Sequence, residues 1–160
     1  MGEALFEWLR GYFSAELAVF FTAWFPIAEL RLAIPLGVSL GVDPFTAFLL
    51  GILGNMVPVI PLLCLLKPVR KFLKQNFSLF KRFFDWLDQR TLKKSDKVDK
   101  YGALGLIFFT AVPLPTTGAW TASLAAVLFK IKFRYALPAI VTGVLIAGVV
   151  ITLSSVFILV

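Results

Sequence analysis

The sequence contains no histidine and only one cysteine, Cys64. Without histidine, the chain lacks the side chain that most often acts as a general base or a metal ligand near neutral pH. A single cysteine cannot form a disulfide within the chain. There is also no glycine-rich phosphate-binding loop, which argues against an ATP-driven pump. No nucleophile–base pair or cluster of metal-binding side chains is recognisable, so we expect no enzymatic activity, no cofactor and no metal site.

Charged residues are absent from two long stretches, residues 44–66 and 135–160. Each stretch exceeds the roughly 20 apolar residues that cross a hydrocarbon core of ~30 Å. Across the chain, 59% of residues are hydrophobic and 16% are charged, whereas soluble domains carry about 25% charged residues. We therefore expect an all-α integral membrane protein with one membrane domain, residues 1–160, and transmembrane helices at 44–66 and 134–160.

Most of the sixteen lysines and arginines fall in residues 67–100. Apolar residues recur there with helical spacing, opposite a basic face. The pattern predicts a basic amphipathic helix on the cytoplasmic side, which either lies on anionic lipid headgroups, with each cation contributing roughly 1 kcal/mol, or packs under the helix bundle. A regulatory or partner-binding helix is the alternative. Because the membrane explains these charges, we expect no nucleic-acid binding. Residues 1–14 predict a shorter interfacial helix with Trp8 near the headgroups.

Two further apolar stretches, residues 15–41 and 101–129, are interrupted halfway along their length. Pro26 and Pro35 interrupt the first, and Pro113 and Pro115 interrupt the second. Non-helical backbone at membrane depth is tolerated only where protein or a water-filled cavity surrounds it. We expect each stretch to form a re-entrant helical hairpin broken at these prolines.

The two interrupted stretches share a sequence and an order of features. Phe-Phe-Thr-Ala at 20–23 recurs at 108–111, and each copy precedes a proline-containing break and a transmembrane stretch. This favours two inverted repeats, each a re-entrant hairpin followed by a transmembrane helix, joined by the cytoplasmic basic helix. Basic residues favour cytoplasmic loops, so 67–100 and 130–134 lie inside and both termini outside. Four complete spans are the alternative.

Glu29 and Arg31 are the main candidate functional residues. A charge at the centre of a membrane segment costs roughly 2.5–3.5 kcal/mol, so such residues usually have an internal partner or a water-filled site. Glu29 is a candidate to bind and release a proton, and Arg31 suits a phosphate or carboxylate group on a substrate. The alternative is a buried structural ion pair that holds the two hairpins together.

The second break offers a polar group of residues that can bind substrate. Thr116, Thr117 and the backbone at Gly118 suit an anion at a helix start, and Trp120 suits an aromatic or cationic group. Alternatively, a threonine caps the helix and Trp120 packs. Asn55 lies in an otherwise apolar span, where it either lines the cavity or forms a structural hydrogen bond.

Small residues four apart allow helices to approach closely. Ala47 and Gly51 have this spacing, as do Gly143 and Ala147. These faces either pack hairpins within one chain or form a homodimer.

Two motifs resemble those of the small multidrug export protein family, a branch related to the DedA (VTT-domain) membrane proteins. They are Glu29-x-Arg31-x-x-Ile34-Pro35-x-Gly37 and Pro113-x-Pro115-x-Thr117-Gly118-Ala119-Trp120.

The resemblance implies a pair of inverted re-entrant hairpins in the cytoplasmic (inner) membrane of a prokaryote. It also implies proton-dependent transport or movement of lipid carriers such as undecaprenyl phosphate, with Glu29 and Arg31 at the positions of the embedded acidic and arginine residues. DedA relatives carry an arginine in the second hairpin, where this chain has Thr116 and Thr117.

We therefore expect a small secondary transporter in which Glu29 couples proton movement to an amphipathic or anionic substrate. Two alternatives remain open. One is a lipid flippase or scramblase for a polyprenyl phosphate or phospholipid. The other is a membrane assembly or scaffold protein that transports nothing.

Overall fold

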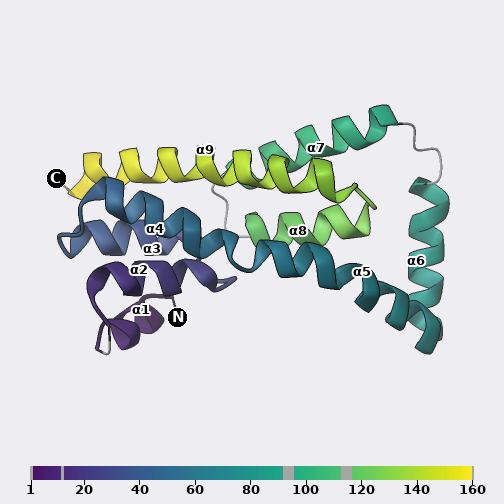
Figure 1. Cartoon of the computed structure of the whole chain (residues 1–160), viewed down its shortest axis with the longest axis horizontal. Coiled ribbons are helices and arrows are strands. Elements are labelled where there is room, and N and C mark those ends of the chain that lie inside the picture. Colours follow the sequence, from purple (N-terminus) through teal and green to yellow (C-terminus); the bar gives the residue numbers. More distant parts are fainter. Residues whose placement is uncertain (1, 12, 92–95, 113–116, 160) are drawn as a thin grey trace.

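The computed structural model describes residues 2–11, 13–91, 96–112 and 117–159, in which every regular element is an α-helix (Figure 1). The expected all-α fold is confirmed. In chain order the helices are α1 (Gly2–Arg10), α2 (Ala15–Trp24), α3 (Glu29–Ser39), α4 (Pro44–Met56), α5 (Val59–Asn76), α6 (Ser78–Thr91), α7 (Asp96–Ala111), α8 (Ala119–Leu128) and α9 (Phe133–Leu159).

Two helical stretches, Pro44–Leu65 and Phe133–Ile158, are long and apolar enough to cross a membrane. At 1.5 Å per residue they extend about 33 and 39 Å, which exceeds the hydrocarbon core. The second stretch leaves large apolar side chains on the surface, among them Leu153 and Phe157, which are 56% and 88% exposed. Apolar surface of this extent suits contact with lipid better than contact with water.

The first of these stretches is broken near its middle, because α4 ends at Met56 and α5 begins at Val59. Pro58 lies at the break, where it has no backbone N–H to donate to the carbonyl four residues earlier. α5 then continues beyond the apolar stretch as far as Asn76.

Residues 67–100 are not one helix, so that expectation is wrong in this respect. They comprise the end of α5, the whole of α6 and the beginning of α7. The first boundary has a local cause, because the Asn76 side chain donates a hydrogen bond of 2.9 Å to the Phe72 carbonyl. Asparagine side chains compete in this way with the backbone hydrogen bonds of a helix.

Two pairs of short helices flank the apolar spans. α2 and α3 form the first pair, within residues 15–41. α7 and α8 form the second pair, which begins at Asp96, before residue 101. In Figure 1, α2 and α3 lie towards the left end of the long axis and α8 lies towards the right. α4 runs from left to right into α5, whereas α9 runs back from right to left.

Only one proline in the first pair lies at the break between its helices. Pro26 lies in the turn at 25–28, as expected. Pro35 was expected to break the chain, and this is wrong, because α3 continues through it from Glu29 to Ser39. A proline inside a helix removes one backbone hydrogen bond without necessarily ending the helix. Pro113 and Pro115 lie outside the described residues.

The second helix of each pair ends in the same way. Gly41 has a φ of +84° and Lys130 has a φ of +55°, both in the left-handed region. The next residue then donates its amide back into the helix, from Val42 to the Gly37 carbonyl at 3.0 Å and from Ile131 to the Ala126 carbonyl at 2.8 Å. Both ends are Schellman-type caps, in which an apolar residue closes the last turn.

In each half, the transmembrane stretch that follows the helix pair packs against that pair at a glycine. A Cβ added at Gly54 in α4 would collide with the Phe20 carbonyl of α2, and one at Gly143 in α9 would come within 2.5 Å of Thr110 in α7. Gly54 and Gly143 are separated by the same number of residues as Gly41 and Lys130, so the two glycines occupy matching positions in the two halves. The two halves of the chain therefore share cap geometry, element order and close contacts.

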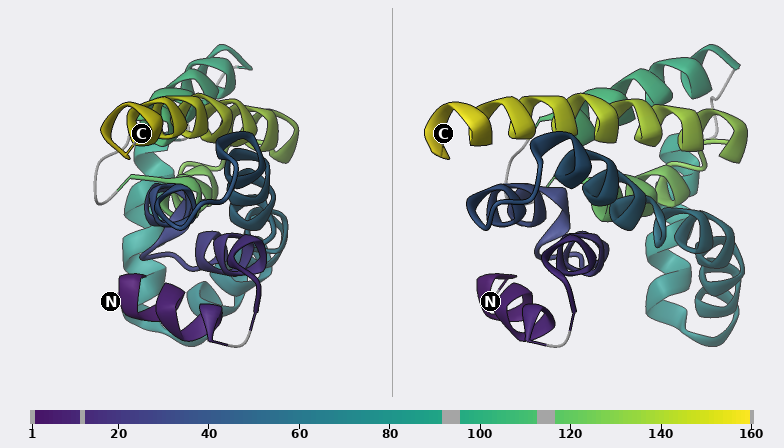
Figure 2. Two further views of the ribbon diagram at one scale, coloured as in Figure 1. Left: turned by 90° about the vertical axis from the view of Figure 1, so that its left-hand side faces the viewer. Right: turned by 60° about the vertical axis from the view of Figure 1, so that its left-hand side comes forward.

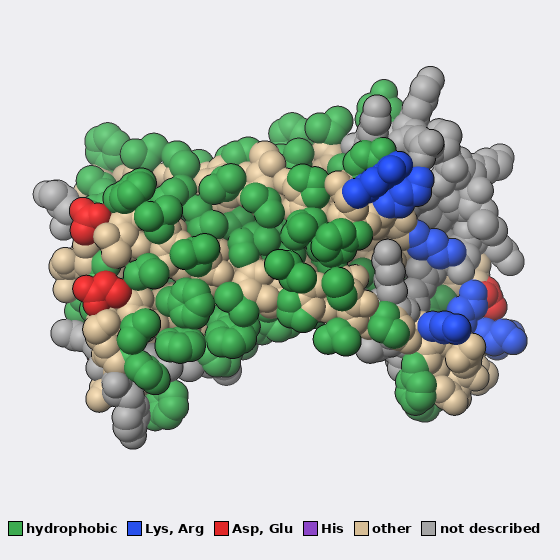
Figure 3. Space-filling model, viewed as in Figure 1, with side chains coloured by type: hydrophobic (Ala, Val, Ile, Leu, Met, Phe, Trp, Pro, Cys, Tyr) green, Lys and Arg blue, Asp and Glu red, His purple; other side chains and the backbone are tan. Residues whose placement is uncertain are grey.

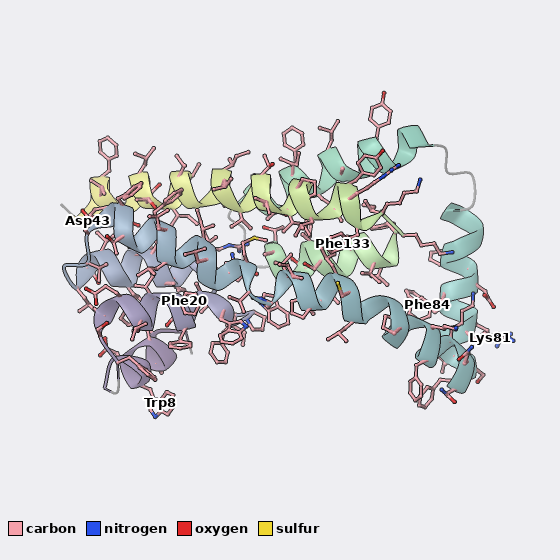
Figure 4. All side chains as sticks on the ribbon, viewed as in Figure 1. Trp8, Phe20, Asp43, Lys81, Phe84 and Phe133 are labelled. Atoms are coloured by element: carbon pink, nitrogen blue, oxygen red, sulfur yellow. The ribbon has the colours of Figure 1, made fainter. Side chains whose placement is uncertain are left out.

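Charge is distributed unevenly along the long axis. On the face in Figure 3, hydrophobic side chains cover the middle, while lysines and arginines gather at the right-hand end. Trp8 and Asp43 lie at the left end in Figure 4, and Lys81 and Phe84 lie at the right. At the right end, α6 lies across the long axis in Figures 1 and 2. It exposes Phe83 and Trp86, as a helix at a membrane surface would.

Candidate functional site

Glu29 is the first residue of α3 and is held in an unusual position. Its φ is +46°, and its backbone amide donates 2.9 Å to the Phe25 carbonyl to close the turn between α2 and α3. The left-handed conformation is unfavourable for a residue with a Cβ, by roughly 1–2 kcal/mol. Only 6% of the residue is exposed. The turn thus holds a buried carboxylate at the start of a short helix, in a conformation that an unconstrained glutamate would avoid.

The carboxylate of Glu29 lies against the start of α8. The backbone amides of Ala119 and Trp120 donate hydrogen bonds to it. Gly118 immediately precedes α8, and a Cβ at this position would collide with both oxygens of the Glu29 carboxylate. The amino terminus of a helix attracts negative charge because its first amides lack partners within the helix. Glu29 therefore joins the first helix pair to the second by an anion–helix contact.

Arg31 provides the positive charge of the site. One guanidinium nitrogen lies 3.9 Å from Oε2 of Glu29 and donates a 3.3 Å hydrogen bond to Oγ1 of Thr117. The Thr117 hydroxyl in turn donates 2.6 Å to the Val112 carbonyl. The Arg31 side chain is 19% exposed. This side chain therefore contacts both helix pairs while part of it remains accessible.

A small cavity lies beside this ion pair. Its volume is about 50 Å³. Its lining residues are Pro26, Ile27, Ala28, Glu29, Arg31, Thr117 and Thr121. A space of this size holds a few waters, whereas a drug-sized ligand needs about 300–1,000 Å³. In this conformation the cavity has room for a few waters or a small ion but not for a drug-sized ligand.

An aromatic groove adjoins the cavity through Pro26. It has a volume of about 430 Å³ and is lined by Trp24, Phe25, Pro26 and Trp120. The indole nitrogen of Trp120 donates 3.1 Å to the Trp24 carbonyl at the end of α2. Trp120 therefore both joins the two helix pairs and presents an aromatic surface next to the charged cavity.

The structure brings together most of the predicted site residues. Glu29, Arg31, Thr117, Gly118 and Trp120 meet where the two helix pairs touch, whereas Thr116 lies outside the described residues.

Asn55 does not line the cavity. It is 1% exposed, and among the described residues its Oδ1 atom has no hydrogen-bond partner. Asn55 therefore lies outside this cavity, and no hydrogen bond to its Oδ1 atom supports the structural alternative.

Several site residues escaped the sequence analysis. Thr121 lines the cavity, and its hydroxyl donates 3.2 Å to the Gly118 carbonyl. Trp24 and Phe25 form the aromatic groove. Both residues lie beside the Pro26 break, and this position could have indicated a role in the site. Aromatic residues are so frequent in this chain that the position alone did not distinguish them. Within the described residues, no group of three or more acidic or cysteine side chains could hold a metal.

These features define a helical membrane protein in which a buried glutamate and a partly exposed arginine of one short helix lie at its contact with another. Residues 29–150 match the family described as "Putative small multi-drug export protein". Because the match covers more than half of the chain and begins at Glu29, the chain belongs to this family, and the resemblance to it is confirmed. No curated protein matches the chain. No solved structure matches it either.

Proposed function

We propose that this protein is a small secondary transporter in which protonation of Glu29 drives movement of an amphipathic or anionic substrate. The observation that carries the proposal is the pairing of buried Glu29 with partly exposed Arg31, which lies where α3 contacts the start of α8 and borders a polar cavity. Buried charges in a membrane protein are costly unless they are paired, and they commonly mark the path of an ion or a substrate.

The proposed architecture is a pair of re-entrant hairpins that enter the membrane from opposite sides. The opposite placement of the two helix pairs along the long axis, their shared cap geometry and their contact at Glu29 and Gly118 support it. Discontinuous helices that meet at the midplane of inverted repeats form the substrate sites of several transporter folds. This architecture would also support the relation to the DedA proteins.

The proposed orientation follows from charge. Lys71, Lys81, Lys130 and Arg134 are exposed, and the right-hand end of Figure 3 is rich in basic residues. By the positive-inside rule this end faces the cytoplasm. Both chain termini lie towards the other end in Figure 1, and would face the outside of a prokaryotic inner membrane.

The proposed coupling step is the neutralisation of Glu29. The charged carboxylate accepts amide hydrogen bonds from α8 and attracts the Arg31 guanidinium. A proton on this carboxylate removes its charge, which weakens both interactions. The α8 amides and Arg31 then become available to an anionic group on the substrate, and the two helix pairs can separate. Loss of the proton on the other side restores the closed contact.

The experiment that tests this proposal is flux in proteoliposomes with an imposed pH gradient. The probes are a lipophilic fluorescent anion, a lipophilic fluorescent cation and a short-chain polyprenyl phosphate. We expect wild-type protein to transport at least one of them, and Glu29→Gln to lose the dependence on the pH gradient. Glu16→Gln is the matched control, because Glu16 is exposed at the start of α2 and does not line the cavity.

Two results would contradict the proposal in different ways. Gradient-driven flux that persists in folded Glu29→Gln would remove Glu29 from the coupling step. Absence of gradient-driven flux for all three probes with folded wild-type protein would contradict transport and leave the ion pair a structural role.

A further inference from the structure

The second helix pair carries an apolar groove that is separate from the Glu29 site. It lies between α7 and α8 and has a volume of about 470 Å³. Gly105, Leu106, Phe109, Ala125, Phe129 and Ile131 form most of its lining. A Cβ added at Gly105 would meet no atom within 4 Å, so the groove is open at this point.

The corresponding place in the first helix pair is filled. The Phe6 side chain of α1 is fully buried in a cluster with Ala18 of α2 and Ala33 of α3. Phe21 and Leu40 pack against this cluster. When the two halves are matched through their repeated sequence and their caps, Phe21 corresponds to Phe109 and Leu40 to Phe129. The groove in the second half is therefore shaped for an apolar group of the kind that Phe6 supplies in the first.

The rim of the groove differs in charge between the two halves. In the second half, Lys130 lies between the lining residues Phe129 and Ile131, and Lys132 follows. Both lysines are exposed, and each also interacts with another group of the chain. At the matching positions the first half has Gly41 and Asp43. An apolar groove with two cations at its mouth complements a molecule that has an apolar chain and an anionic head.

Lys130 occupies this rim at a conformational cost. Its φ of +55° lies in the left-handed region, which Gly41 occupies at the same cap in the first half. A residue with a Cβ is less stable than glycine in this conformation. A strained residue in place of glycine suggests that its side chain has a role that glycine could not fill. At the mouth of this groove, that role is to place a positive charge.

We propose that the groove between α7 and α8 binds an anionic phospholipid, with one acyl chain along Gly105 and Phe109 and the headgroup at Lys130 and Lys132. The lipid comes from the leaflet at the basic end of the molecule. The site is distinct from the Glu29 site and does not depend on transport, because none of its lining residues borders the charged cavity.

The test is a native mass spectrometry titration of the full chain in detergent with phosphatidylglycerol or phosphatidylcholine. We expect one phosphatidylglycerol to bind each monomer more tightly than phosphatidylcholine does. Lys130→Gly should weaken the first binding event about fivefold, the effect of one cation near an anionic surface. Because glycine relieves the left-handed strain, this variant should unfold at the same or a higher temperature than wild type.

Two further variants distinguish lipid binding in the groove from attraction of the lipid to the general positive charge at this end of the molecule. Gly105→Leu places a side chain in the groove, where its Cβ meets no atom within 4 Å, and should weaken binding about tenfold, by displacing roughly two methylene groups of the acyl chain. Lys81→Gln removes a positive charge from α6 at the same end of the molecule but leaves the groove intact. Its effect should be less than twofold.

Several outcomes would overturn the proposal. Equal binding of the two lipids, or an effect of Lys81→Gln as large as that of Lys130→Gly, would mean that no headgroup site exists at this rim. Displacement of the lipid by millimolar inorganic phosphate alone would mean that contact of the acyl chain with the groove contributes nothing to the binding affinity. Lipid bound only to a dimer would assign the groove to the contact between two copies. Normal binding by Gly105→Leu would place the acyl chain elsewhere.

Discussion

The two helix pairs of this protein differ in how completely their arms pack together. In the first pair, Gly37 of α3 approaches Val19 of α2 so closely that no Cβ fits, and Phe6 closes the space beside them. In the second pair, α8 packs more extensively against α5 than against α7, and an open groove separates α7 from α8. The two halves thus share caps and element order while one is closely packed and the other is open.

This difference bears on how the site could operate. The closely packed pair supplies the charged side chains, Glu29 and Arg31, and the open pair supplies the α8 amides and Thr117. The charged side chains thus lie on the closely packed half, and the amides that contact Glu29 lie on the open half. If the site opens, we expect α8 to move relative to α7 while α2 and α3 remain together.

The largest predicted difference between the halves concerns two phenylalanines. Phe6→Ala removes a fully buried ring and should lower the free energy of unfolding by about 3 kcal/mol or more. Phe109→Ala, at a ring that is 40% exposed and borders the open groove, should cost much less. Thermal unfolding in the same detergent measures both. Equal losses would mean that the two halves are equally packed.

Glycine substitutions should show the same contrast with a smaller effect. Gly54→Ala forces a Cβ onto the Phe20 carbonyl and should cost about 1–3 kcal/mol, as overpacking usually does. Gly105→Ala meets no neighbour and should stabilise α7 by up to about 1 kcal/mol through its higher helix propensity. The midpoint of chemical unfolding of each variant is the measurement. A destabilised Gly105→Ala would contradict the open groove.

The contact between the halves can be tested at Gly118. Gly118→Ala should weaken the protein by about 1–2 kcal/mol, because its Cβ displaces the Glu29 carboxylate. Glu29→Asp withdraws the carboxylate by one methylene group, so the double variant should be less destabilised than the sum of the single ones. A double-mutant cycle in unfolding free energy measures this coupling. Strict additivity would show that the two residues do not touch.

The smallest predicted effects are at the matched caps and have opposite signs. Gly41→Ala should destabilise the protein by about 1 kcal/mol, because alanine is unfavourable at a φ of +84°. Lys130→Gly should stabilise it by a similar amount, of about 1 kcal/mol. Differential scanning calorimetry on both variants checks the signs. The same sign for both would mean that the two caps are not equivalent.

Much of the site was predictable from the sequence because charge in an apolar stretch is easily recognised. Glu29 and Arg31 stood out on that basis, and Thr117, Gly118 and Trp120 through their place beside a proline-rich break. The expected break at Pro35 was wrong because proline removes only one hydrogen bond of a helix whose other contacts remain. The continuous helix expected over 67–100 was wrong at Asn76, where one side chain competes with the backbone.

Other features left no signal in the sequence because they depend on contacts between distant segments. Phe6 and Phe109 are both phenylalanines on helical stripes, yet only Phe6 is fully buried. The left-handed conformation of Lys130 belongs to the folded cap at the end of α8, and a lysine at that position in the sequence does not indicate it. A residue's side chain and its neighbours in sequence do not specify which distant helix it will face.

A helical membrane protein with two interrupted stretches and a rare pair of charges could be predicted from the residues alone. The reason is that hydrophobicity, proline and charge act locally and are readable position by position. Packing of the folded chain is what brings Glu29 onto the amides of α8 and leaves the groove between α7 and α8 open. Those outcomes depend on which helices pack together, and in this protein the two halves, though matched in sequence features, pack differently.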